Sequence, residues 1–202
     1  MNNKVITIFG TGFIGKSLIF KLLQNGFIIN AVCRNPYLRG NLRSMANVGQ
    51  LEVNYGDITK PNTIENYFEK SDYIINLVGV LAENSKNKYS EAHVLGPKNI
   101  GMLSKKYSIK QLIHISSIGA DTKSNIKYQK TKGEGEIAIK ENYKDVNIIR
   151  PSIVFGPEDG FFNLQAKLLK SSPITPLFGG GKNKFQPIYV NDLVDGIINI
   201  LK

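Results

Sequence analysis

Three glycines stand between a short apolar run and an amphipathic segment near the start of the chain. Val5 to Phe9 is β-branched and apolar, which is typical of a buried strand, and Phe13 to Asn25 carries apolar residues at helical spacing. The turn between them reads Gly10-Thr11-Gly12-Phe13-Ile14-Gly15 and fits the pattern G-x-G-x-x-G. A strand, a glycine turn and a helix in this order predict the first unit of a parallel α/β sheet.

Strands and helices continue to alternate along the first 150 residues, and the strands are mostly apolar instead of alternating between apolar and polar residues. We expect strands at 5–9, 27–33, 51–55, 73–78, 111–115 and 146–149, and helices at 13–25, about 36–46, 61–69, 89–107 and 127–141. Strands of this kind indicate a sheet that helices cover on both faces. The sequence therefore predicts an α/β fold with a doubly wound, Rossmann-like parallel sheet.

Composition excludes several classes of protein. The chain has 202 residues and a net charge of +10, but its 22 lysines and 4 arginines are spread along its length and no nucleic-acid-binding motif appears, so we expect no nucleic-acid partner. Cys33 is the one cysteine, which excludes an intrachain disulfide and fits a reducing, cytoplasmic compartment.

His93 and His114 lack partners at metal-ligand spacing, so we expect structural roles for them and no metal site. No apolar run approaches the roughly 20 residues of a transmembrane helix.

The glycine turn predicts a dinucleotide site. Gly10 permits the tight turn, Gly12 lets the backbone approach a pyrophosphate, and Gly15 lets the helix pack closely on the strand. Free N–H groups and the positive end of the helix dipole then bind the anion. The alternative is a glycine-rich turn without a ligand. The residues expected to bind the diphosphate are Gly10, Thr11, Gly12, Phe13, Ile14 and Gly15.

The end of the second strand bears on the choice of cofactor. NAD-binding folds place an acid there for the ribose 2′-hydroxyl, whereas residues 30–36 contain none and Arg34 stands at about that position, with Arg39 and Arg43 beyond. We therefore expect NADP(H) to be favoured over NAD(H), unless Arg34 is only a solvated loop charge. Other cofactor-binding residues expected at strand ends are Asp57 and Ile58 for the adenine, and Asn76 and Gly79 for the nicotinamide half.

A candidate catalytic pair follows the fifth strand. Tyr128 and Lys132 form Tyr-x-x-x-Lys on one face of a predicted helix. A nearby ammonium lowers the pKa of tyrosine from its ordinary value of about 10, so the pair could exchange a proton with a carbonyl or alcohol while a nicotinamide exchanges hydride. We expect both to contact the cofactor, and Ser116 and Ser117 to hydrogen-bond the reacting oxygen. The pattern also arises by chance in a lysine-rich chain.

The character of the sequence changes after Arg150. Glycines and prolines gather at Gly156-Pro157, Pro173 to Pro176 and Gly179 to Gly181, with helices expected at about 161–169 and from Asn191 onward. We therefore expect an NAD(P)-binding domain over 1–150. Residues 151–202 are expected to begin a smaller, incomplete C-terminal part on the substrate side.

Together, the glycine turn, the serine pair and Tyr128-x-x-x-Lys132 resemble the short-chain dehydrogenase/reductase superfamily. Later segments are similar to its atypical branch, related to NAD-dependent epimerases and dehydratases, that contains the alpha-subcomplex subunit 9 of respiratory complex I and bacterial relatives. These segments are HVLGPKNI (93–100), HISSIGAD (114–121), RPSIVFGPEDGFFN (150–163) and PLFGGGKNKFQPIYVNDL (176–193).

The resemblance implies a protein that binds NADPH and has an accessory, structural or assembly role near a membrane quinone oxidoreductase. Its implied partners are complex I subunits, and its implied place is peripheral, on the cytoplasmic or matrix-equivalent face of the respiratory membrane. Two alternatives stay open. One is a catalytic NADPH-dependent reductase or sugar-nucleotide-type epimerase that uses Tyr128 and Lys132. The other is a truncated, non-functional remnant, since members of this branch continue beyond the segment that ends here.

Overall fold

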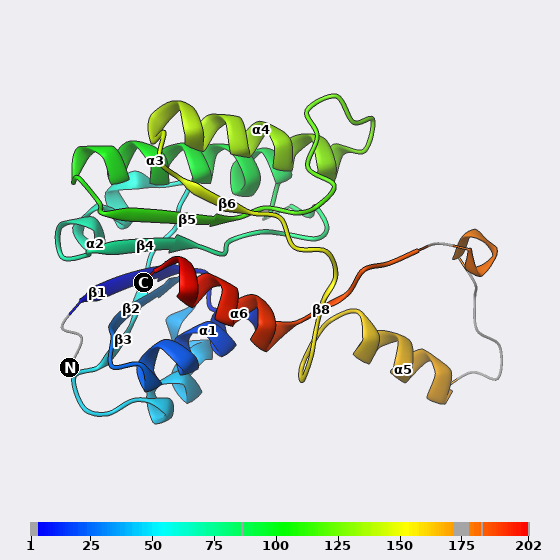
Figure 1. The fold of residues 1–202 in the computed structure, drawn as a ribbon, viewed down its shortest axis with the longest axis horizontal. Helices are drawn as coiled ribbons and strands as arrows, with labels where there is room; N and C mark the ends of the chain where they lie inside the picture. The colour runs from blue at the N-terminus through cyan, green and yellow to red at the C-terminus, as the bar shows by residue number, and fades with distance from the viewer. Residues whose placement is uncertain (1–3, 86, 172–177, 183, 202) are drawn as a thin grey trace.

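The computed structural model describes residues 4–85, 87–171, 178–182 and 184–201. Its centre is a six-stranded sheet in the order β3-β2-β1-β4-β5-β6, with every neighbouring pair parallel (Figure 1). The order runs outward in both directions from β1 and β4, which confirms the predicted doubly wound α/β fold. The strands are β1 (Val5–Phe9), β2 (Ile28–Cys33), β3 (Leu51–Tyr55), β4 (Tyr73–Asn76), β5 (Gln111–Ile115) and β6 (Asn147–Ile149).

Helices cover both faces of the sheet and create two apolar cores. Successive strand residues face opposite cores, because side chains alternate along a strand: Ile75 and Ile113 enter one, and Ile74 and Leu112 enter the other. The first core lies under α1 (Phe13–Gln24) and α6 (Val190–Ile200), and the second under α2 (Glu65–Glu69), α3 (Gly96–Lys106) and α4 (Lys127–Asn142) (Figure 1).

Three of the expected helices differ in detail. Pro36–Met45 forms 3₁₀ turns rather than an α-helix, and the helix expected over 61–69 divides into a 3₁₀ turn at Pro61–Thr63 followed by α2. The helix expected over 89–107 begins as a π-helix, Ser90–Leu95, and becomes α3 at Gly96. π-turns often mark functional sites, and this one carries His93 toward α4.

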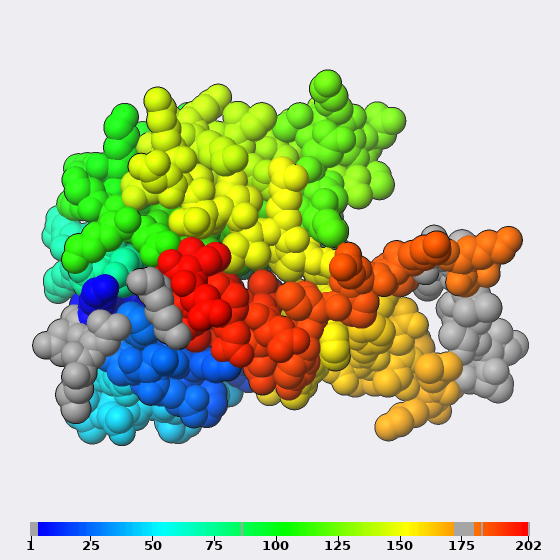
Figure 2. Space-filling model, in the orientation of Figure 1, coloured from blue at the N-terminus to red at the C-terminus, as the bar shows by residue number. Residues whose placement is uncertain are grey.

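After Arg150, one part of the chain packs against the sheet domain and another part extends away from it. β7 (Val154–Phe155) pairs in parallel with β8 (Ile188–Tyr189), and neither two-residue strand was expected. α5 (Phe162–Ser171) projects from the body (Figures 1 and 2), whereas α6 packs on α1 in the first core. A further 3₁₀ turn spans Phe178–Gly181. Pro173 to Pro176 lie outside the described residues, and the domain division at residue 150 stays a prediction.

Candidate functional site

The glycine turn has three distinct local environments. Gly10 has φ +104°, and a Cβ there would lie 3.1 Å from the backbone carbonyl carbon of Leu77. A Cβ at Gly15 would lie 2.2 Å from the carbonyl oxygen of Gly10, so α1 packs closer to the turn than any side chain allows. A Cβ at Gly12 would meet nothing within 4 Å, and no side chain caps α1. The helix N-terminus is therefore open to an anion, as the sequence predicts.

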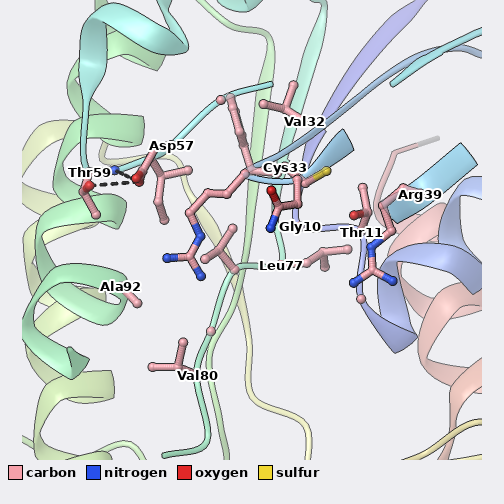
Figure 3. A pocket seen from close by; sticks show the side chains of 18 of the residues that line it. Gly10, Thr11, Val32, Cys33, Arg39, Asp57, Thr59, Leu77, Val80 and Ala92 are labelled. Carbon is pink, nitrogen blue, oxygen red and sulfur yellow. Dashed lines mark hydrogen bonds between the residues drawn. The ribbon is translucent and has the colours of Figure 1, made fainter. Parts of the chain in front are cut away.

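A cavity of about 350 Å³ opens beside this turn, at the carboxyl ends of β1, β2, β3 and β4 (Figure 3). This volume is within the range of small-molecule sites, and the edge where a doubly wound sheet reverses direction is where such folds bind ligands. Seven residues predicted from the sequence line it: Gly10, Thr11, Gly12, Arg34, Asp57, Ile58 and Gly79. Lining residues that the cofactor prediction did not include are Phe9, Val32, Cys33, Asn35, Leu38, Arg39, Gly56, Thr59, Leu77, Val78, Val80 and Ala92.

Six predicted cofactor residues do not line this cavity: Phe13, Ile14, Gly15 and Asn76, and also Tyr128 and Lys132, which are described below. Phe13 borders a second cavity of about 240 Å³, beside Gly156, and Ile14 packs against the first core. Gly15 acts through its contact with Gly10. Asn76 is fully buried, and its side chain accepts a hydrogen bond from the Val78 N–H (3.1 Å) and lies 3.1 Å from His114 Nδ1. The Asn76 side chain therefore fixes the backbone that follows β4 and does not point into the cavity.

The cavity carries uncompensated positive charge. Arg34 and Arg39 both line it, and neither forms an ion pair with any residue the structure describes. Arg39 and Thr11 of the glycine turn both line the cavity (Figure 3). The one lining acid, Asp57, accepts hydrogen bonds from the Thr59 N–H (3.0 Å) and hydroxyl (2.8 Å) through a single oxygen, which ties its carboxylate into the turn after β3. The arrangement favours an anionic ligand.

Lys132 connects α4 with the part of the cavity that Gly79 lines. Its Nζ donates to the carbonyl oxygen of Ile115 (2.9 Å), and a Cβ built on Gly79 would lie 4.0 Å from that nitrogen. The side chain is buried, and burial lowers the pKa of Lys132 to about 8, against a smaller opposite effect of Glu136. An ammonium has three N–H donors, so one bond to a carbonyl leaves donors available for hydroxyl or phosphate oxygens.

The pKa of Tyr128 differs from the expectation. Burial raises the pKa of the Tyr128 phenol instead of Lys132 lowering it. The ammonium of Lys132 is directed to the backbone of β5, which accounts for its lack of influence. The nearby Ser117 hydroxyl acts in the opposite direction to burial, although its geometry to the phenol does not meet that of a formed hydrogen bond. Among the described residues, Tyr128 is therefore a protonated group at neutral pH.

Two buried hydroxyls in this region have no partner. The Oγ atoms of Ser116 and Ser117, at the end of β5, are buried and accept or donate no hydrogen bond within the described parts of the chain. A buried hydroxyl without a partner costs free energy unless a ligand or water satisfies it. The two hydroxyls and the uncapped N-terminus of α1 at Gly12 could each hydrogen-bond a ligand that has several polar groups.

The two histidines lie next to the candidate site and contact residues of the elements that form it. The Nε2 atom of His93 accepts from the Val80 N–H (3.2 Å), and its Nδ1 lies 3.1 Å from the Thr131 hydroxyl, so His93 ties the β4 end to α4. Burial, with Lys132 in second place, lowers the pKa of His93 to about 4 and that of His114 to about 3. Both imidazoles are therefore neutral at pH 7, with structural roles, as expected from the sequence. No cluster of three or more metal-ligating side chains occurs in the described ranges.

A scan of family models gives a match over residues 6–202, to the NAD dependent epimerase/dehydratase family. The chain belongs to this family. The match extends over both the glycine-turn half and the segment after Arg150, which confirms the resemblance inferred from the motifs.

Among curated proteins, the NADH dehydrogenase [ubiquinone] 1 alpha subcomplex subunit 9, mitochondrial, of Mus musculus is 34% identical over 203 residues, covering 98% of this chain and 53% of that protein. Its Dictyostelium discoideum counterpart is 30% identical, covering 98% and 55%. The ceramide reductase of Caulobacter vibrioides is more distant, at 24% identity over 86% of this chain and 53% of that protein. The chain thus spans about half the length of the curated relatives it matches.

Solved structures of epimerase/dehydratase enzymes share the fold. UDP-glucuronic acid 4-epimerase from Bacillus cereus, solved with UDP-glucuronic acid and NAD, superimposes with a TM-score of 0.79 at 20% identity, covering 98% of this chain and 73% of the other. dTDP-glucose 4,6-dehydratase from Bacillus anthracis, solved with NAD, gives 0.78 at 23% identity, covering 98% and 71%. None of the helices over the described ranges is both long and apolar enough to cross a bilayer.

Proposed function

We propose that this chain is a nicotinamide-dinucleotide-binding accessory protein that associates with respiratory complex I and has a structural or assembly role near this membrane quinone oxidoreductase. The similarity to subunit 9 proteins over 98% of the chain supports the association. The cavity beside an open helix N-terminus, lined by glycines and two unpaired arginines, supports the binding. The protein would lie peripherally on the cytoplasmic or matrix-equivalent face of the membrane.

We further propose that the bound form is NADP(H). The cavity places no acid at the end of β2 and offers Arg34 there, and Arg39 also lines it. An acid at that position would bind the ribose 2′-hydroxyl of NAD, whereas a guanidinium attracts the 2′-phosphate of NADP. The glycine turn would hold the diphosphate, and Lys132 and the Ser116 and Ser117 hydroxyls would reach the nicotinamide half.

Thermal unfolding with each dinucleotide tests this proposal. A ligand at about 100 times its Kd stabilises the native state by about 2.7 kcal/mol, which raises the Tm of a chain this long by roughly 5–10 °C. We expect that shift with NADPH at a concentration where NADH gives little. Arg34→Ala should weaken NADPH binding by roughly 10- to 100-fold, the loss of one charge-assisted contact, and leave NADH unchanged. Arg43→Ala, an exposed arginine outside the cavity, is the matched control. Equal shifts with both dinucleotides would refute the preference.

Association is tested by tagging the full chain in its own cells. Co-purification with subunits of the membrane NADH:quinone oxidoreductase supports the proposal, and recovery as a monomer from membrane-free extract contradicts it.

A second candidate function is a reductase or epimerase. The unpartnered hydroxyls of Ser116 and Ser117 and the half-buried Tyr128 favour it, since together they could orient and protonate a reacting oxygen. Tyr128→Phe discriminates the two functions. The accessory role predicts unchanged NADPH binding and unchanged complex assembly, whereas the enzyme predicts loss of turnover with binding retained. A third possibility is a non-functional remnant, and expressing the chain and measuring whether it unfolds cooperatively addresses it.

A further inference from the structure

Asn99 is a buried polar side chain of α3 that contacts the turn after β3. It is 7% exposed, and its Nδ2 donates a hydrogen bond of 2.9 Å to the backbone carbonyl oxygen of Ile58. The two residues are 41 positions apart in the sequence, so this bond links α3 to the edge of the cavity that Ile58 lines. A buried amide with a hydrogen bond of this length fixes the direction of the carbonyl group that it contacts.

Gly96, one turn before Asn99, holds the side chain of the same isoleucine. A Cβ at Gly96 would lie 2.2 Å from Ile58 Cδ1, so the Ile58 side chain lies directly against the backbone of α3. Residues three positions apart share one face of a helix. This face of α3 therefore holds both the side chain and the carbonyl group of Ile58.

The peptide unit that Asn99 holds also reaches the Asp57 carboxylate. The Ile58 carbonyl and the Thr59 N–H belong to one planar trans peptide, so fixing the direction of one group fixes that of the other. This Thr59 N–H donates to Asp57 Oδ1 (3.0 Å), and the Thr59 hydroxyl donates to the same oxygen (2.8 Å). Asn99 thus orients, through one peptide unit, the carboxylate of an acid that lines the cavity.

We propose that Asn99 is a positioning residue that aims the Asp57 carboxylate at the amino group of the adenine. This inference rests on the proposed dinucleotide site, in which Asp57 lies beside the adenine. An ionised carboxylate accepts hydrogen bonds and donates none. It therefore pairs with the exocyclic amino group of adenine and disfavours the carbonyl oxygen that hypoxanthine carries in the same place. Both bonds from Thr59 use Oδ1, so Oδ2 is the atom assigned to the amino group.

The preference for adenine over hypoxanthine tests the proposal. The Kd values of NADPH and of its hypoxanthine analogue are measured on the full chain by titration calorimetry. A hydrogen bond to a charged group changes affinity roughly 10- to 100-fold, so the wild type should prefer NADPH by at least about tenfold. Asn99→Leu, which is nearly isosteric, leaves the Ile58 carbonyl without this donor and should reduce the preference to about threefold or less. Because the preference is a ratio measured on one variant, a general loss of stability does not change it.

Thr131→Val is the matched control. Thr131 is 6% exposed on α4, its hydroxyl donates to the Lys127 carbonyl (2.9 Å) and lies 3.1 Å from His93 Nδ1, and it does not line the cavity. This nearly isosteric change also removes a buried polar group, and it should leave the preference within about twofold of the wild type. Asn99→Ser is the second variant, for the case that the leucine variant does not fold. Its side chain is too short to reach the Ile58 carbonyl but leaves room for a water, so we expect the same loss of preference.

The outcomes separate this inference from the proposed function. An Asn99 variant that keeps the wild-type preference, or a Thr131→Val protein that loses it equally, overturns the positioning role. A wild type that binds NADPH without preferring it to the hypoxanthine analogue also overturns that role and leaves the proposed function standing. A wild type that binds neither dinucleotide contradicts the proposed function and the inference together.

Discussion

Gly135 is where α4 meets the π-helix that carries His93, backbone against backbone. A Cβ at Gly135 would lie 1.8 Å from the carbonyl oxygen of His93, and ordinary contact begins at 3.4 Å. Gly135→Ala therefore forces the two backbones about 1.6 Å apart. Overpacking of this kind costs up to about 3 kcal/mol, and alanine's helix propensity offsets about 1 kcal/mol. We expect a net loss of about 2 kcal/mol, which lowers the Tm by roughly 4–8 °C.

The same change should reach the candidate site. Lys132 lies on α4 three residues before Gly135, and its amine bonds the Ile115 carbonyl beside the cavity. Displacement of α4 should therefore also reduce the stabilisation that NADPH gives. The control is Gly196→Ala on α6, where a Cβ would meet nothing within 4 Å. This variant should gain about 1 kcal/mol from helix propensity alone. Urea unfolding of both variants measures the difference, and a Gly135→Ala protein as stable as the wild type would refute the close-packing argument.

Three further predictions concern buried charge and the projecting helix. Lys132→Met should raise the free energy of unfolding of the ligand-free protein by about 1–2 kcal/mol, because a buried cation with a lowered pKa is destabilising. The same change should weaken NADPH binding. Urea unfolding measures the stability, and a variant less stable than the wild type would contradict the prediction. His93 and His114 have folded pKa values of about 4 and about 3, below the value near 6.5 of the unfolded chain. Their contribution to stability is therefore complete above about pH 6.5 and decreases as the pH falls toward 4, by on the order of 1.4 kcal/mol per pH unit for each histidine; urea midpoints that stay constant over this range would contradict it. Asp159→Ala removes the acceptor of the first N–H groups of α5, so limited proteolysis should cut within 160–171 faster than in the wild type, with the sheet domain still intact.

The sheet was predictable because its strands have a simple physical signature. Val5–Phe9 and Gln111–Ile115 begin and end where the sequence predicts them, since burial on both faces requires strands that are mostly apolar. β7 and β8 were missed because each is two residues long and the two lie more than 30 positions apart. The π-helix before α3 was also missed, since the contact between Gly135 and the His93 carbonyl becomes visible only when α4 is in place.

The candidate site was predictable where a residue's chemistry marks it and not where only its backbone position matters. Gly10 to Gly12 and Arg34 line the cavity, whereas Asn76 has the right place in sequence but points into the protein. Leu77, Val80 and Ala92 line the cavity without any chemical feature that the sequence could reveal. The pKa of Tyr128 was expected to fall and instead rises, because it depends on burial and on where the Lys132 amine points.

The packing of α6 on α1 has a consequence for synthesis of the protein. Six side chains after residue 189 belong to the same core as β1 and α1: Val190, Leu193, Val194, Ile197, Ile198 and Leu201. During translation, the emerging N-terminal half exposes that apolar face of its sheet until α6 leaves the ribosome. Contacts between segments so distant in the chain form late, and the uncovered face is prone to aggregate meanwhile. A nascent polypeptide arrested before residue 190 should therefore bind chaperones that recognise apolar surfaces, and release them once α6 has emerged.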